Sequence, residues 1–103
     1  MRSIRLSITF NDQLNELLDY GEVVFGTRLA EQKKLAVYNA IEHYLRPHPG
    51  TRQPDPILGL RRYPVSRTPF VLLYDFDDAE VRVHFIFHQN ASLDDLDPTS
   101  AQW

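Results

Sequence analysis

The amino-acid sequence predicts an α+β domain: a strand and an antiparallel helical hairpin, then a three-stranded antiparallel sheet with both helices on one of its faces. Period-two apolar alternation at the start, two segments of helical periodicity and three strand-like segments near the end support this order. The length of 103 residues and the 43% of hydrophobic residues fit one globular domain. We expect that domain to span residues 1–103, with residues 91–103 as a C-terminal tail.

The chain opens with a strand and a helix. Apolar and polar residues alternate from Ile4 to Phe10, which is typical of a half-buried strand. Asn11 can then cap a helix, and apolar residues at spacings of three and four predict an amphipathic helix over residues 12–25. Gly21 lies on the apolar stripe of this helix and costs helix stability, so we expect a second helix to approach closely there.

A second helix is expected over residues 28–46. Gly26 can end the first helix and Thr27 can cap the next, so the short gap between them forces an antiparallel hairpin. Pro47 and the Pro-Gly pair that follows it stop the second helix.

Three strands are expected in the second half of the chain. Residues 57–65 contain Pro64, which restricts this strand to an edge or an end. Residues 70–76 are nearly continuous apolar and aromatic, as in a central strand. A short turn joins them to residues 80–89, so these two strands form an antiparallel hairpin. The tail after them is expected to be loose unless Trp103 docks.

The last strand separates apolar from polar side chains. Its odd-numbered residues are expected to meet the helices: Val81, Val83, Phe85 and Phe87. Its even-numbered residues then project from the uncovered face: Arg82, His84, Ile86 and His88. In residues 57–65 the leucines are expected to face the core, which places Arg61 and Tyr63 on the same open face.

The resulting patch of guanidinium, imidazole and phenol groups has two interpretations. Such groups bind phosphate and stabilise negative charge, and a histidine can transfer protons near neutral pH, so an RNA-cleaving site could be assembled from them. Polar residues on the outer face of a strand are also what solvent exposure selects. The pattern alone leaves both interpretations open.

Charge and composition restrict the partners and cofactors. The net charge of −3 argues against a general nucleic-acid binder, although residues 46–67 carry five arginines and a single aspartate. There is no cysteine, and two histidines four residues apart on one strand lie about 13 Å from each other, so neither a metal nor a cofactor is expected. No signal peptide or membrane-spanning segment is predicted, which favours a cytoplasmic protein.

The order of elements resembles the ParE/RelE toxin superfamily, and short motifs strengthen the resemblance to its ParE branch. These motifs are Pro49-Gly50, Leu58-Gly59-Leu60-Arg61, the strand from Pro69 to Tyr74, the strand from Val81 to His88, and Tyr20 and Gly26 in the first helical segment. Together they extend over residues 4–90, which is most of the chain.

The resemblance implies a plasmid- or chromosome-borne toxin that arrests growth until a cognate antitoxin neutralises it in a toxin–antitoxin hetero-oligomer. The ParE branch implies a DNA gyrase inhibitor that is not itself an enzyme, and the acidic net charge, the lack of lysine near the presumed site and Tyr74 favour this branch. The RelE branch implies, as the alternative, an endoribonuclease that cuts mRNA on the ribosome. A second alternative is an inactive antitoxin-binding homologue, because Gln89-Asn90-Ala91-Ser92 stands where arginines often follow the strand-end histidine.

The resemblance also implies which residues form the site. For target binding these are Arg61, Arg62, Tyr63, Arg67, Tyr74, Arg82 and His88. For mRNA cleavage they would be Arg61, Arg82, His84 and His88. Both sets depend on one expectation, that Arg61 and Arg82 point outward from the same open face of the sheet.

Overall fold

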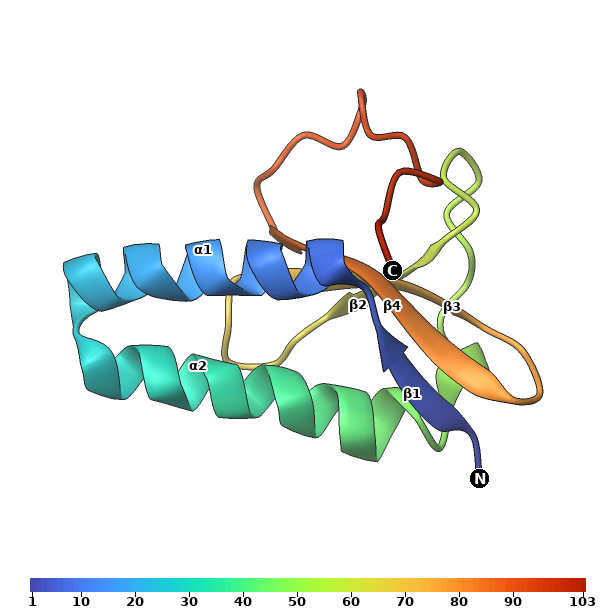
Figure 1. The fold of residues 1–103 in the computed structure, drawn as a ribbon, viewed down its shortest axis with the longest axis horizontal. Coiled ribbons are helices and arrows are strands. Elements are labelled where there is room, and N and C mark those ends of the chain that lie inside the picture. Colours follow the sequence, from blue (N-terminus) through green and yellow to red (C-terminus); the bar gives the residue numbers. More distant parts are fainter.

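The computed structural model describes residues 1–103. Its elements are β1 (Ser3–Leu6), α1 (Ile8–Phe25), α2 (Thr27–Ala40), the π-helical turn η1 (Ile41–Leu45), the 3-10 turn η2 (Pro49–Thr51), β2 (Arg61–Pro64), β3 (Phe70–Phe76) and β4 (Glu80–His88). One sheet has the order β1-β4-β3-β2, in which β1 runs parallel to β4 and the other pairs are antiparallel. The predicted α+β class is confirmed, with β1 as a fourth strand of the sheet (Figure 1).

The hairpin of α1 and α2 covers one face of the sheet, and its tip extends past the strands (Figure 1). Gly26 joins the helices with φ +93°, a conformation that side-chain-bearing residues rarely adopt. The close helix approach predicted at Gly21 is wrong, because a Cβ atom there would meet no atom within 4 Å. Neither helix has the length and apolar character needed to cross a membrane.

β1 is shorter than the predicted strand because Ser7 ends it. The Ser7 hydroxyl accepts a hydrogen bond from the backbone N–H of Phe10 at 2.8 Å and donates one to the carbonyl of His84 at 2.6 Å. Ser7 is therefore the N-cap of α1, in place of Asn11. The helix consequently includes Phe10, which is fully buried.

β2 begins at Arg61, four residues later than predicted. The carboxylate of Asp55 accepts hydrogen bonds from the N–H groups of Ile57 and Leu58 at 2.9 and 3.0 Å. Gly59 follows with φ +74°. A turn built around this aspartate therefore replaces the first half of the predicted strand, and β2 lies at the sheet edge as its proline predicted.

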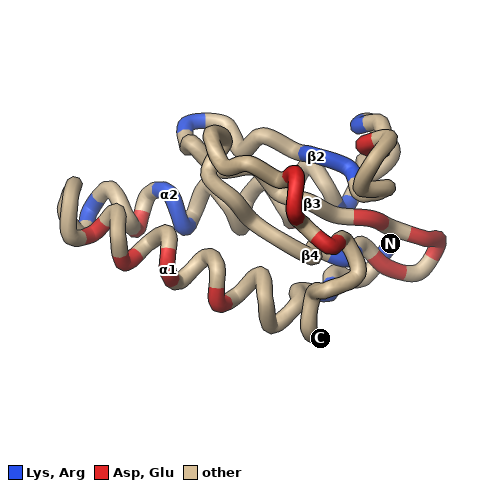
Figure 2. The backbone as a smooth tube through the Cα atoms, turned by 90° about the horizontal axis from the view of Figure 1, so that it is seen from above, with Lys and Arg blue, Asp and Glu red and all other residues tan.

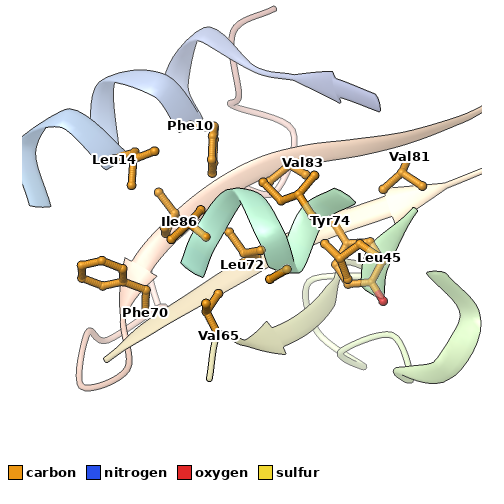
Figure 3. Close-up of a cluster of buried hydrophobic side chains, with 13 residues drawn as sticks. Phe10, Leu14, Leu45, Val65, Phe70, Leu72, Tyr74, Val81, Val83 and Ile86 are labelled. Carbon is orange, nitrogen blue, oxygen red and sulfur yellow. The ribbon is translucent and has the colours of Figure 1, made fainter. Parts of the chain in front are cut away.

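The main hydrophobic core lies between the helical hairpin and the sheet (Figure 3). Phe10 and Leu14 reach it from α1, Leu45 from η1, and Leu72 and Tyr74 from β3. Each is at most 2% exposed, and burial of one such side chain stabilises the fold by about 2 kcal/mol.

A β-bulge in β4 changes which side chains face the helices. β3 pairs with β4 on both sides of His84 but leaves His84 itself without a partner. The valines before it face the helices as predicted. After it the alternation shifts by one residue, so Phe85 and Phe87 lie on the opposite face and Ile86 joins the main core. His88 pairs with Phe70 of the main core, so it also lies on the helix side. The predicted orientation of Phe85, Ile86, Phe87 and His88 is therefore wrong.

A second hydrophobic cluster occupies the face of the sheet turned away from the helices, here called the reverse face. Its buried members are Leu58, Leu60, Leu73 and Phe85. The tail packs against them through Leu93, Leu96 and Ala101. In Figure 1 this segment, coloured orange to red, arches away from the end of β4 and returns to the start of α1. The apolar part of the reverse face is thus covered by the chain itself, where the sequence predicted an open surface.

Candidate functional site

The pairing of β2 with β3 decides where the predicted site residues point. Arg61 pairs with Tyr74, and Tyr63 pairs with Leu72. Both partners belong to the main core, and paired residues share a face, so Arg61 and Tyr63 project on the helix side of the sheet. Arg62, which lies between them, projects from the reverse face.

Arg61 and Arg82 therefore lie on opposite faces of the sheet, and the predicted shared patch is wrong. Arg82 stands between two valines of the main core and points to the reverse face as predicted. The error concerns Arg61, because the prediction assumed that Leu58 and Leu60 face the helices. These leucines belong instead to the reverse-face cluster, so the alternating residues of β2 turn toward the helix side.

Arg61 and Tyr63 meet further side chains at the β2 edge, and together they form what we call the arginine–tyrosine cluster: Tyr44, Arg52, Arg61, Tyr63 and Phe76. Nη1 of Arg61 donates to the carbonyl of Arg52, and its guanidinium lies 4.9 Å from the ring centre of Phe76. The Arg52 guanidinium lies 5.4 Å from the Tyr63 ring centre. Tyr63 in turn stacks with Tyr44, their ring centres 6.5 Å apart. Guanidinium–aromatic packing thus holds the cluster together.

Tyr74 supports this cluster from inside the core. It has no exposed surface, and its hydroxyl donates a hydrogen bond to the carbonyl of Pro49 in η2 at 2.7 Å. Burial raises the pKa of the Tyr74 hydroxyl, and the nearby positive charges of Arg61 and Arg52 oppose that rise. Tyr74 was predicted as a target contact, but its burial gives it a positioning role.

The positive charge of the cluster is not neutralised by carboxylates. Neither Arg52 nor Arg61 forms an ion pair. Arg2 adds a third guanidinium, 5.2 Å from the same phenylalanine ring. Beside it, Arg46 pairs with Glu42 at 2.6 Å and donates to the Arg2 carbonyl. Figure 2 shows the contrast, with arginine along β2 and acidic residues around the β3–β4 turn.

Arg82, by comparison, is enclosed by carboxylates. Its guanidinium contacts three of them: Asp75 at 2.9 Å, Asp77 at 2.7 Å and Glu80 at 3.1 Å. Nε2 of His84 lies 2.9 Å from the same oxygen of Asp75. This network satisfies the arginine internally.

The network changes the protonation equilibria of its carboxylates. The hydrogen bond from Arg82, together with the N–H groups of Glu80 and Ala79, lowers the pKa of Asp77 to about 2. Burial alone would raise the pKa of Asp75, but hydrogen bonds from Arg82 and His84 outweigh it and the pKa lies below its ordinary value. The same bonds raise the pKa of Arg82. These groups are therefore charged and mutually compensated near neutral pH.

The remaining predicted site residues lie apart from the arginine–tyrosine cluster. Arg62 pairs with Asp55 at 3.2 Å on the reverse face. Arg67 lies in the β2–β3 turn with φ +66°. His88 ends β4, where its Nδ1 accepts a hydrogen bond from the N–H of Asn90. Of the predicted set, only Arg61, Tyr63 and the buried Tyr74 are brought together.

Sequence reasoning missed three members of the cluster. In the sequence, Arg52 is one arginine of the basic stretch, Tyr44 lies within the expected second helix, and Phe76 lies within the expected central strand. The signal for Arg52 was its position in a run of arginines opposed by one aspartate. Nothing in the sequence distinguished Tyr44, whose 59% exposure is evident only in the structure.

Chemically, this arrangement favours binding over proton transfer. Free guanidiniums next to aromatic faces bind phosphates, carboxylates and planar groups. The cluster contains no histidine, lysine or carboxylate that could act as a general base. Two histidines were predicted for proton transfer. His84 lies on the reverse face with Asp75, and His88 pairs with Phe70 at the opposite end of β3 from Tyr74, the partner of Arg61.

Comparisons with known proteins agree with the fold. Residues 4–93 match the model of the ParE toxin family, described as the toxin of the type II toxin–antitoxin system parDE. A solved structure, the chromosomal ParDE toxin–antitoxin system from P. aeruginosa, is similar with a TM-score of 0.70 and 18% identity, over 85% of this chain and 96% of that chain. No curated protein matches the sequence at a significant level. Because the family model covers most of its length, the chain belongs to the ParE family of type II toxin–antitoxin toxins.

Proposed function

We propose that this toxin binds DNA gyrase through the arginine–tyrosine cluster, inhibits it in the cytoplasm and so arrests growth until a cognate antitoxin neutralises the toxin. One observation carries the proposal: Arg52 and Arg61 are uncompensated guanidiniums beside Tyr44, which is 59% exposed. Arginine and tyrosine at an accessible edge are the residue types that dominate binding energy at interfaces.

An inhibitor is favoured over an mRNA endoribonuclease because the cluster lacks a histidine, lysine or carboxylate that could act as a general base. Cleavage of RNA by general acid–base chemistry needs a base within about 3 Å of the proton that it removes. The Tyr74 hydroxyl already donates its hydrogen bond to the Pro49 carbonyl at 2.7 Å, and His84 lies on the other face of the sheet. Arginines and tyrosines also bind single-stranded RNA, which keeps ribosome-dependent cleavage as the alternative.

Exposed apolar side chains on the helical hairpin support an antitoxin partner that binds there. Near its tip, Tyr20 is 70% exposed and Val23 is 87% exposed, and Leu35 is exposed on α2. Beside them, α1 and the end of β4 form a groove lined by Leu17 and Phe87. Exposed apolar side chains next to a groove are typical of a site that a folding-upon-binding segment covers.

The test is a pair of assays on the purified toxin. In the first, gyrase supercoils a relaxed plasmid at increasing toxin concentration; in the second, a translation reaction reports mRNA cleavage. We expect supercoiling to stop while the mRNA stays intact. Cleaved mRNA with normal supercoiling would support the endoribonuclease instead, and no effect in either assay from a chain that still binds its antitoxin would identify an inactive homologue.

A further inference from the structure

The C-terminal tail closes the reverse face of the sheet. Leu93, Leu96 and Ala101 pack on a cluster that contains the fully buried Leu73 and the nearly buried Phe85. Without the tail, these side chains would form an apolar surface on the sheet.

The end of the tail is fastened to the start of α1. The Gln102 carbonyl accepts hydrogen bonds from the N–H groups of Ile8 at 2.6 Å and Thr9 at 3.4 Å. The N–H of Gln102 donates to the hydroxyl of Thr9 at 2.9 Å. These bonds satisfy two N–H groups that the first turn of a helix leaves free.

Trp103 completes this attachment as a shallow latch. Its ring meets the His84 ring edge-on, with centres 4.8 Å apart, and the Arg5 guanidinium lies 4.9 Å from its ring centre. The side chain is still 39% exposed, so its contacts are peripheral. Few groups therefore need to separate for the latch to open.

Before its attachment at Gln102 and Trp103, the tail forms only local hydrogen bonds. Leu96 bonds back to Leu93, and Ser100 to Asp97, so the tail adds no strand to the sheet. No aspartate of the tail forms an ion pair. The family match ends at residue 93, so the fold that it describes does not include this segment.

From these contacts we infer that residues 93–103 form a displaceable strap, which covers the apolar cluster on the reverse side of the sheet and opens as a unit when Trp103 releases. In the closed form the reverse-face cluster is buried under the tail and is not available to partners. Opening exposes the reverse-face cluster and leaves the main core intact. The inference does not depend on gyrase as the target.

Thiol labelling tests the strap, because the chain contains no cysteine. Leu72 and Leu73 are neighbours on β3 and both have no exposed surface, but Leu72 belongs to the main core and Leu73 to the reverse-face cluster. Leu72→Cys and Leu73→Cys are therefore matched reporters. Each is combined with Trp103→Ala, and with Tyr20→Ala as a control that removes an aromatic side chain far from the latch.

We expect Leu73→Cys to be labelled about tenfold faster than Leu72→Cys, and Trp103→Ala to add about another tenfold at the reverse face only, because local opening is easier than global unfolding. Tyr20→Ala should change neither rate. Equal acceleration of both cysteines, or none, would overturn the inference. If a cysteine variant does not fold, amide hydrogen exchange in Trp103→Ala tests the same inference. The exchange rates of Ile8 and Thr9 must rise relative to the natural protein, while the rates in β3 stay unchanged.

Discussion

Two arginines on the strands that flank β3, Arg61 on β2 and Arg82 on β4, have opposite surroundings. Arg82 has three carboxylates within 3.1 Å, and its charge is compensated within the fold. Arg61 has none, and its guanidinium packs on Phe76 at 4.9 Å. An internally paired guanidinium stabilises its own fold, whereas an unpaired one at an edge remains available to a partner. The residue type alone therefore does not identify the functional arginine.

Replacement of Arg82 has the largest expected effect on stability. Arg82→Ala leaves Asp75, Asp77 and Glu80 close together without their cation, and the arginine side chain is only 22% exposed. We expect the free energy of unfolding to fall by about 2 kcal/mol, measured by urea denaturation. Gyrase inhibition by the fraction that remains folded should be unchanged. A stable variant that no longer inhibits would reverse the roles assigned to the two arginines.

Tyr74→Phe tests how the core supports the arginine–tyrosine cluster. The substitution keeps the ring but leaves the Pro49 carbonyl without its buried donor, so we expect a loss of about 1 kcal/mol in unfolding free energy. Because η2 precedes Arg52 directly, inhibition should weaken as well, by a few-fold. Leu14→Ala is a control that destabilises the same core from α1, and it should leave inhibition by the folded protein unchanged.

Acid should weaken the Arg82 network within a defined window. The pKa of Asp77 is about 2 in the folded protein, and that of Asp75 is also lowered. Because these folded-state values lie below the unfolded ones, their stabilisation is complete above about pH 4 and disappears as the pH falls toward 2. We expect the Tm difference between the natural protein and Arg82→Ala to shrink over this window. A constant difference would show that the carboxylates do not depend on Arg82.

Regular periodicity predicted most of the fold. Residues 70–76 form β3 as predicted, and both helices follow their apolar stripes. The errors arise where one residue changes the outcome: Ser7 caps α1 early, and Asp55 folds the start of the strand predicted over residues 57–65 into a turn. Such side-chain-to-backbone bonds are local choices that periodicity does not detect.

The site was harder to predict, because it depends on which face each strand presents. The unpaired His84 inverts the end of β4, and the tail creates a second apolar cluster that attracts Leu58 and Leu60. With apolar residues on both faces, alternation no longer indicates which face is covered. The sequence therefore identified Arg61 and Tyr63 as candidates but gave them the wrong neighbours.

The most direct test of the account compares Arg61→Ala with Arg62→Ala in the gyrase supercoiling assay. These chain neighbours point to opposite faces, and Arg62 is paired with Asp55 at 3.2 Å while Arg61 is unpaired. Loss of a charge-assisted contact in Arg61→Ala should raise the half-inhibitory toxin concentration about tenfold or more, and Arg62→Ala should stay within about twofold of the natural protein. Equal losses, or a larger loss for Arg62→Ala, would contradict the assignment of the binding site to the arginine–tyrosine cluster.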